Sequence, residues 1–230
     1  MYKAIIFDLD NTLLDYTRSE LDSMRQTVRD HNLFIDEEAK WEVFWPTYLQ
    51  HNFKHWMDFV HNLGPHASIH DVLRSSFRDT LNMSQSLHDE LSNTYWHYFC
   101  NTCYFEEGAL EVLNKLGASY PFGIISNGIH EAQQKRLLAG QIQDYFQSIV
   151  VSDKAGFRKP RKEIFDIALQ ELNVDRREVL FVGDSLSDDY QGALNAGIDF
   201  CFYNRAKQPV PVDIKPAYAI HELKELLQVV

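Results

Sequence analysis

The chain has 230 residues, of which 45% are hydrophobic and 13% aromatic, so it can bury a substantial core in one large domain, or in a main domain with a smaller one. With 22 basic and 33 acidic residues the formal net charge is −11, which argues against nucleic-acid polymers and anionic membrane surfaces as partners. No segment approaches the roughly 18 apolar residues of a membrane span. Because the N-terminus also lacks the basic start and cleavage site of a secretory signal, we expect a cytoplasmic protein.

The first predicted element is a buried strand, KAIIFD (residues 3–8), which leads into two carboxylates one residue apart. Asp8 and Asp10 are followed by Thr12 and by a third acid, Asp15. Ionised carboxylates beside an apolar core are unfavourable unless a positive charge pairs with them. The sequence therefore predicts that cations gather at the end of this strand.

Helical patterns without a convincing strand fill residues 16–103. Apolar residues share a helical face from Leu21 to Val28, aromatic residues recur at helical spacing from Trp41, and a Gly-Pro pair at 64–65 interrupts the middle. The aromatic stripe is more typical of helix packing in the core of this domain than of a surface that stacks a base; it comprises Trp41, Trp45, Tyr48, Phe53 and Trp56. We expect residues 16–103 to form an all-helical domain inserted into a main domain of residues 1–15 and 104–230.

From residue 105 onward, short runs rich in Val, Ile and Phe alternate with amphipathic helical patterns, such as those around Leu113 and Ile164. This alternation predicts an α/β fold, namely a Rossmann-like parallel sheet with helices on both faces. The predicted strands are FGIIS (122–126), SIVV (148–151), VLFVG (179–183) and FCFY (200–203).

The three cysteines, Cys100, Cys103 and Cys201, are an odd set in a sequence without an export signal. The CNTC spacing at 100–103 matches half of a redox or zinc motif, but no second cysteine pair completes it. We expect reduced thiols at a helix end.

Polar residues follow four of the predicted strands. The carboxyl ends of parallel strands form the edge at which an open sheet binds ligands. Three carboxylates brought there make a hard-oxygen site suited to Mg²⁺, and a lysine beside it supplies a second positive charge. The groups are Asp8 and Asp10; Ser126, Asn127 and Gly128; Lys159, reached through a loop; and Asp184, with Asp188 and Asp189 shortly after it.

Each group also has a structural explanation when it is taken alone. Ser126-Asn127-Gly128 is compatible with a turn, Lys159-Pro160 with a solvated lysine before a helix, and the acids of 184–189 with a helix N-cap. Their combined occurrence at successive strand ends favours a catalytic site.

In chain order, these groups resemble the four motifs of the haloacid dehalogenase-like hydrolases, and the resemblance extends over essentially the whole chain. It identifies the helical insertion as the cap that this family places after its first motif. The matching residues are Asp8-Leu9-Asp10-Asn11-Thr12 for the first motif, Ser126 for the second, Lys159 for the third, and Gly183-Asp184 with Asp189 for the fourth.

The resemblance implies a role for each residue. Asp8 would be the nucleophile that forms an aspartyl-phosphate, and Asp10 the general acid and base. Mg²⁺ would be held by the Asp8 carboxylate, the Asp10 carbonyl and Asp184. The remaining roles are phosphate binding by Ser126, the backbone amides of Asn127 and Gly128, and Lys159; fixing of the turn by Thr12; and orientation of metal water or Lys159 by Asp189, with Asp188 as the alternative.

An acid at Asp10 favours phosphoryl transfer over cleavage of a carbon–halogen bond, because a halide leaving group needs no proton. The segments FDLDNTLLDY, ISNGIHEAQQKRLLAG and GDSLSDDYQGALNAGI, with Asn204 beyond them, resemble the house-cleaning pyrimidine 5′-nucleotidase branch. The resemblance implies a small phosphorylated substrate, a nucleoside monophosphate. A phosphatase or mutase of small sugar phosphates remains the alternative, because the core motifs are shared.

A receiver-like phospho-switch would also place an Asp, a Ser or Thr and a Lys around Mg²⁺, and would make the protein a binding module. The acid at Asp10 and the length of the chain argue against it. The sequence decides neither the oligomeric state nor which cap residues select the substrate.

Overall fold

The computed structural model describes residues 2–34 and 37–230. The chain divides into two compact units, one of Met1–Ser19 with Cys103–Val230 and one of Glu20–Thr102. We call the first the core unit and the second the helical unit.

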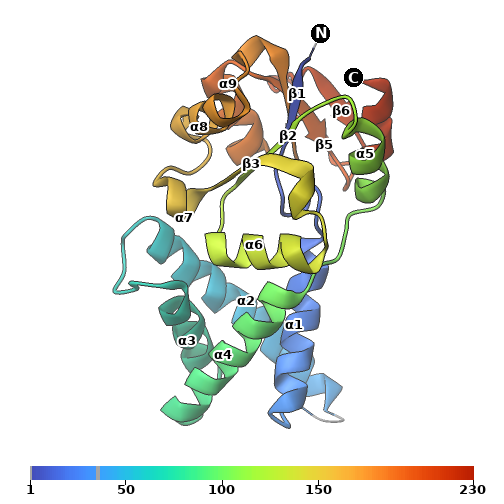
Figure 1. The fold of residues 1–230 in the computed structure, drawn as a ribbon. Helices are drawn as coiled ribbons and strands as arrows, with labels where there is room; N and C mark the ends of the chain where they lie inside the picture. Colours follow the sequence, from blue (N-terminus) through green and yellow to red (C-terminus); the bar gives the residue numbers. More distant parts are fainter. Residues whose placement is uncertain (1, 35–36) are drawn as a thin grey trace. The chain divides into compact units, whose positions relative to one another are not determined.

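Within the described residues, the core unit is built on a six-stranded sheet in the order β3-β2-β1-β4-β5-β6 (Figure 1). All neighbouring strands pair in parallel, with β1 central between β2 and β4. The predicted α/β fold with a parallel sheet is confirmed. The strands are β1 (Ala4–Phe7), β2 (Phe122–Ser126), β3 (Phe146–Val151), β4 (Val179–Gly183), β5 (Asp199–Tyr203) and β6 (Tyr218–Ile220).

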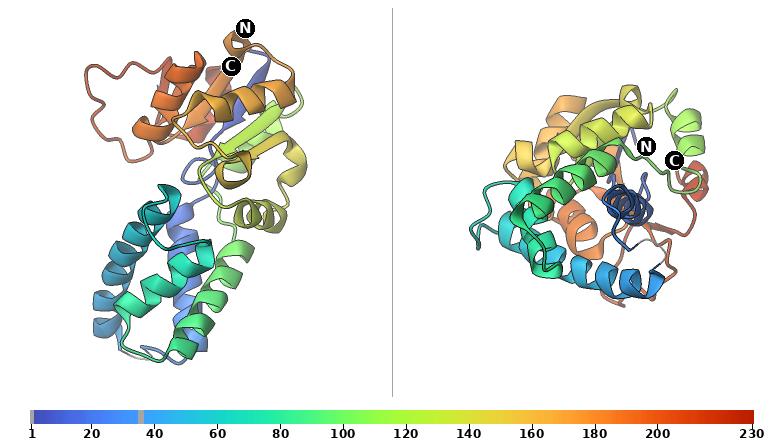
Figure 2. Two further views of the ribbon diagram at one scale, coloured as in Figure 1. Left: turned by 90° about the vertical axis from the view of Figure 1, so that its left-hand side faces the viewer. Right: turned by 90° about the horizontal axis from the view of Figure 1, so that it is seen from below.

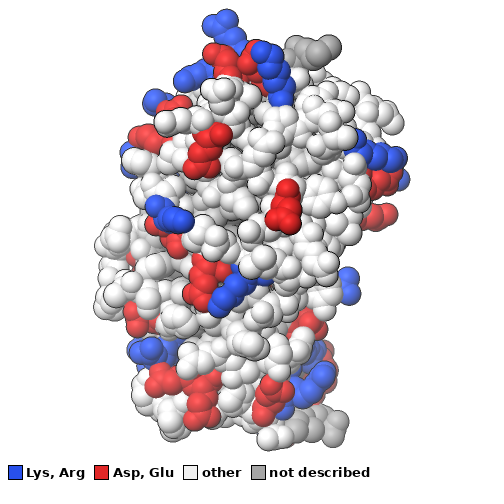
Figure 3. Space-filling model, viewed as in Figure 1, with Lys and Arg blue, Asp and Glu red and all other residues white. Residues whose placement is uncertain are grey.

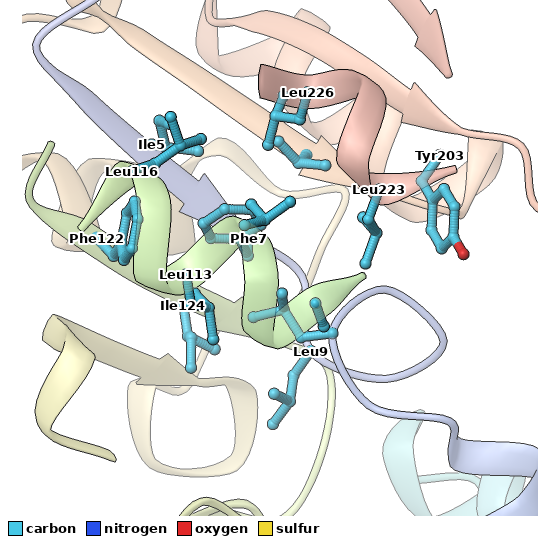
Figure 4. Packing of buried hydrophobic residues seen from close by; sticks show 14 of the residues in the cluster. Ile5, Phe7, Leu9, Leu113, Leu116, Phe122, Ile124, Tyr203, Leu223 and Leu226 are labelled. Atoms are coloured by element: carbon cyan, nitrogen blue, oxygen red, sulfur yellow. The ribbon is translucent and has the colours of Figure 1, made fainter. Parts of the chain in front are cut away.

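Alternate residues of the buried strand β1 divide the core into two layers. Ile5 and Phe7 belong to the apolar cluster that includes residues of α5 (Ala109–Leu116) and η4 (Leu223–Gln228) (Figure 4). Ala4 and Ile6 belong to the cluster that includes residues of α8 (Lys162–Leu172) and α9 (Gln191–Ala196). Helices therefore cover both faces of the sheet, as the alternating pattern predicts. The helices of this unit are α5 (Ala109–Leu116), α6 (His130–Ala139), α7 (Ser152–Ala155), α8 (Lys162–Leu172) and α9 (Gln191–Ala196), with shorter turns η1 (Gln143–Tyr145), η2 (Arg176–Glu178), η3 (Leu186–Tyr190) and η4 (Leu223–Gln228).

The C-terminal edge of the sheet differs from the sequence prediction. The three-residue strand β6 pairs with β5 through the register Cys201↔Tyr218 and Tyr203↔Ile220. It follows a proline-containing loop, and only Ile220 of its residues is buried. A strand this short and this exposed carries too weak a pattern to be recognised from the sequence.

The helical unit consists of α1 (Tyr16–Asp30, which begins in the core unit), α2 (Glu38–Val60), α3 (Ile69–Thr80) and α4 (Gln85–Asn101). Within it α2 packs against α3 and α3 against α4 (Figure 2). The predicted all-helical insertion after the first strand is confirmed.

Most of the aromatic stripe on α2 packs inside the helical unit. Trp41 and Tyr48 are 4% and 0% exposed, and the Tyr48 ring lies 4.8 Å from that of Phe77 on α3. Phe53 is 65% exposed, so the expectation that the whole stripe is core is wrong at this position. The helix turns Phe53 away from the stripe because it lies five residues after Tyr48, a spacing that changes face.

No helix among the described residues has both the length and the apolar character needed to cross a bilayer. On the face of the molecule in Figure 3, acidic and basic side chains are interspersed. None of the three cysteines forms a disulfide within the part of the chain that the structure describes.

Leu113 and Leu110 of α5 offer a matched test of the layer against the sheet. Leu113 is fully buried in the same apolar cluster as Phe7 and Phe122, whereas Leu110 is 40% exposed. We expect Leu113→Ala to lower the free energy of unfolding by about 2–5 kcal/mol, because it leaves a cavity in the core. Leu110→Ala should change it by less than about 1 kcal/mol. Denaturant unfolding followed by fluorescence measures both, and equal effects would contradict the assigned packing.

Candidate active site

Lys159 is buried at the carboxyl edge of the sheet, where it is 2% exposed. Its Nζ donates to Asp8 Oδ1 at 2.5 Å and to the Ile125 carbonyl at 3.0 Å, and it lies 2.6 Å from Asp189 Oδ1. The ammonium group thus has two hydrogen-bond acceptors and a second carboxylate at ion-pair distance. Burial by itself lowers the pKa of Lys159, but Asp189 and Asp8 outweigh this effect and the pKa is raised, so the lysine stays charged.

Asp8 directly follows β1 and is 6% exposed. One carboxylate oxygen contacts Lys159, and the other accepts a long hydrogen bond of 3.4 Å from Thr12 Oγ1. Burial raises the pKa of Asp8 well above its ordinary range; Lys159 opposes this shift, while Asp189 and Asp184 add to it. The carboxylate thus lies where additional positive charge would be strongly favourable.

The chain turns sharply after Asp8. Asn11 has a φ of 60°, in the left-handed region that Asn tolerates better than most residues. The N–H groups of Leu13 and Leu14 both donate to the Leu9 carbonyl, at 3.0 and 2.9 Å. Asp10 therefore lies in a tight loop and does not extend the strand.

Strand β2 ends at the buried Ser126, and Asn127 and Gly128 follow it. The Asn127 side chain forms hydrogen bonds with both backbone groups of Lys159. Its Oδ1 accepts from the Lys159 N–H at 2.8 Å, and its Nδ2 donates to the Lys159 carbonyl at 2.9 Å. The same Nδ2 lies 3.1 Å from Asp188 Oδ2. This side-chain contact was not predicted from the sequence, where only the backbone amide of Asn127 has an expected role.

The segment after β4 brings two further acids to the same edge. Asp184 follows Gly183, and the π-turn η3 places Asp189 at 1% exposure, where its Oδ2 accepts from the Ser185 N–H at 2.9 Å. A Cβ at Gly183 would lie 2.4 Å from Asp189 Oδ2, so only glycine allows this approach. Asp189 contacts Lys159, whereas Asp188 accepts a hydrogen bond from the side-chain amide of Asn127.

Carboxylate oxygens of Asp8, Asp184 and Asp189 all lie within 4.8 Å of one another. Burial and then the charge of Asp189 raise the pKa of Asp184 from 3.8 to about 7. One lysine leaves these acids short of positive charge, and an all-oxygen donor set suits a hard divalent cation. The described residues therefore fit a Mg²⁺-type ion; the Asp10 carboxylate does not belong to this cluster.

The Asp10 carboxylate is bound by two side chains of α6 that the sequence analysis missed. Oδ1 lies 2.5 Å from Nη1 of Arg136, and Oδ2 accepts from Gln133 Nε2 at 2.7 Å. Both residues are buried on the same helix face as Ala132 and Leu137. Polar side chains at core-facing positions of an amphipathic helix were the available signal, because such residues need a buried partner.

Two residues beyond β5 have structural contacts. The Asn204 side chain donates to the Gln208 carbonyl at 2.8 Å and accepts from its N–H at 2.9 Å, which closes the loop after the strand. Arg205 forms an ion pair with Glu106 and donates to Asn11 Oδ1 at 3.1 Å. Arg205 thereby links this loop to the turn that carries Asp10.

The sequence model of the haloacid dehalogenase-like hydrolases matches residues 5–203. The chain belongs to this family. Among relatives of this haloacid dehalogenase-like hydrolase, pyrimidine 5′-nucleotidase YjjG of Escherichia coli is 30% identical, over 97% of this chain and 96% of the relative. Glyceraldehyde 3-phosphate phosphatase of Pyrococcus abyssi is also 30% identical, over 90% of this chain and 83% of the relative.

A solved structure gives the same result for the fold. The putative hydrolase YfnB of Bacillus subtilis, crystallised with magnesium, superposes with a TM-score of 0.80 and 26% identity, covering 99% of this chain and 98% of its own. The family match and these relatives together indicate that the protein is an enzyme, a haloacid dehalogenase-type phosphatase.

The raised pKa of Asp184 predicts a pH-dependent difference between the wild type and Asp184→Asn in metal-free buffer. A carboxyl group whose pKa is raised on folding stabilises the protein at low pH, and loses that contribution as pH rises through the folded value. Because Asn resembles the protonated acid, the variant should gain on the wild type between pH 3.8 and about 7, by about 1–4 kcal/mol. Thermal unfolding with EDTA measures this difference, and a constant difference across the range would contradict the shift.

Proposed function

We propose that the protein is a Mg²⁺-dependent phosphomonoester hydrolase that acts through an aspartyl-phosphate on Asp8, with nucleoside monophosphates as its substrates. The observation that carries the proposal is the placement of one buried carboxylate, Asp8, against Lys159, with a second acid, Asp10, turned into a loop two residues later. A nucleophile and a separate proton donor at one strand end are what a two-step phosphoryl transfer requires.

The proposed metal ligands are the carboxylates of Asp8 and Asp184 and the backbone carbonyl of Asp10. When bound, the ion supplies the positive charge that allows an anionic nucleophile to approach an anionic phosphate. Asp189 contacts Lys159 and lies in the same acidic cluster, so it helps to hold the lysine beside the nucleophile.

In the first step, an Asp8 oxygen forms a bond to phosphorus while the bond from phosphorus to the ester oxygen breaks. The leaving alkoxide takes a proton from Asp10. In the second step, water attacks the aspartyl-phosphate, Asp10 accepts a proton from that water, and the bond from phosphorus to Asp8 breaks. Ser126, the backbone amides of Asn127 and Gly128, and Lys159 would hold the phosphate oxygens.

The nucleotide substrate is supported by the identity to YjjG over nearly the full length of both chains. A second candidate is hydrolysis of a small sugar or triose phosphate. It is supported by the glyceraldehyde 3-phosphate phosphatase, whose sequence is also 30% identical to this chain. Both candidates use the same core chemistry and differ in what lies beyond the phosphate.

Replacement of the nucleophile gives the first test. Purified protein with Mg²⁺ should release phosphate from 4-nitrophenyl phosphate, and Asp8→Asn should reduce kcat by at least about 1,000-fold, because the amide cannot form the acyl phosphate. Asp166→Asn, on the surface of α8 beside Lys162, is the matched control and should retain wild-type activity. Circular dichroism checks that both variants fold, and activity that survives Asp8→Asn would exclude the mechanism.

A screen of monophosphates tests the substrate. We expect kcat/KM for UMP or dUMP to exceed that for glyceraldehyde 3-phosphate and hexose phosphates by about tenfold or more, since specificity reflects differential transition-state binding. Released phosphate is measured under identical metal and pH conditions. A sugar or triose phosphate that exceeds every nucleotide would replace the first candidate with the second.

A further inference from the structure

Within the described part of the chain, the most deeply buried charged side chain outside the acidic cluster lies on α6. Among the described residues Arg136 heads the largest fully buried side chains at 0% exposure, and Gln133, one helical turn earlier, is 2% exposed. Burying a guanidinium is unfavourable unless a negative group compensates it. Asp10 is that group. Burial by itself lowers the pKa of Arg136, but the charge of Asp10 and its hydrogen bond contribute to a net rise.

Asp10, Gln133 and Arg136 form a closed ring of contacts. Arg136 Nη1 donates to Asp10 Oδ1 at 2.5 Å and to Gln133 Oε1 at 3.0 Å. Gln133 Nε2 donates to Asp10 Oδ2 at 2.7 Å and also to Ser126 Oγ at 2.9 Å. Each oxygen of the Asp10 carboxylate therefore has its own donor, and one amide nitrogen connects Asp10 to the serine of the second motif.

Gly128 provides the space for this arrangement. A Cβ at this position would lie 2.7 Å from Gln133 Nε2 and 3.3 Å from its Cδ. Any larger residue would push the Gln133 amide away from both Asp10 and Ser126. The contacts of Gln133 with Asp10 and Ser126 therefore depend on the absence of a side chain at Gly128.

We propose that Arg136 and Gln133 are positioning residues that orient Asp10 for proton transfer, an inference that rests on the proposed function. Arg136 holds Oδ1 as an acceptor throughout the reaction. Gln133 donates to Oδ2 while that oxygen is unprotonated. When Oδ2 carries the proton, the leaving-group oxygen replaces the Gln133 amide as its partner; after the P–O bond breaks and the proton moves to the alkoxide, Oδ2 again accepts from Gln133.

The test separates proton transfer from every other step by changing the leaving group. An alkyl phosphate such as UMP needs a proton on its leaving oxygen, whereas 4-nitrophenolate leaves without one. The ratio kcat/KM reports steps up to release of the alcohol or phenol, so hydrolysis of the aspartyl-phosphate does not affect it. General acid catalysis contributes about 10²–10⁴-fold, which gives the measurable range.

We expect Arg136→Met and Gln133→Leu to reduce kcat/KM for the alkyl phosphate by at least about tenfold, and to change it for 4-nitrophenyl phosphate by less than about threefold. Arg136→Lys restores a donor without the guanidinium fork and should recover part of the loss. Lys135→Gln, on the exposed face of α6 beside Glu131, is the matched control and should behave as the wild type on both substrates. Gln133→Leu provides a test that keeps the buried charge pair if Arg136→Met does not fold.

Asp10→Asn is measured in parallel as the reference for complete loss of the acid. In one outcome, Asp10→Asn lowers kcat/KM only for the alkyl phosphate, whereas Arg136→Met and Gln133→Leu lower it equally for both substrates. This outcome would overturn the positioning role and leave the proposed function intact. A Gln133→Leu variant with wild-type kcat/KM for both substrates would also overturn the positioning role. If Asp10→Asn itself shows no selectivity between the two substrates, the assignment of Asp10 as the acid fails instead.

Discussion

The ammonium group of Lys159 meets two buried carboxylates and a backbone carbonyl at the centre of the sheet edge, and the rest of the site depends on this interaction. Without it, Asp8 and Asp189 would be ionised acids in an apolar surrounding, which proteins avoid. With it, one positive charge faces three clustered carboxylates, and the remaining shortage of positive charge suits the site to a divalent cation. Burial raises the pKa of Asp8 and Asp184, and the charges of the neighbouring carboxylates add to this shift.

The close approach of these groups requires glycine at two positions of the supporting backbone. Gly183 and Gly128 each lie where a Cβ would collide with a functional side chain, Asp189 in the first case and Gln133 in the second. Parallel pairing of β1 with β4 brings Phe7 beside Val182, so the residues that follow both strands emerge side by side. Sheet register and two missing side chains therefore decide the distances in the site as much as the charged residues do.

The sequence predicted the parallel sheet and the clustering of strand-end residues because both follow from strong local patterns: uninterrupted apolar runs, and polar groups directly after them. It did not predict the partners of Asp10, since nothing in the spacing between residues 10 and 136 indicates that they meet. Gln133 and Arg136 were recognisable only as polar residues on a core-facing helix stripe. Strand β6 was missed because its few residues are mostly exposed.

The side-chain amide of Asn127 binds the backbone N–H and carbonyl of Lys159, and so joins the end of β2 to the loop after β3 as one rigid element. The conformational entropy of a long lysine side chain and its loop is thereby lost when the chain folds and not when a ligand arrives. In the proposed reaction, an incoming phosphate would meet donors that are already aligned, and little reorganisation energy would remain to be supplied. In that reaction, the side-chain amide of Asn127 would act on catalysis through the timing of an entropy loss, without itself having to contact the reacting atoms.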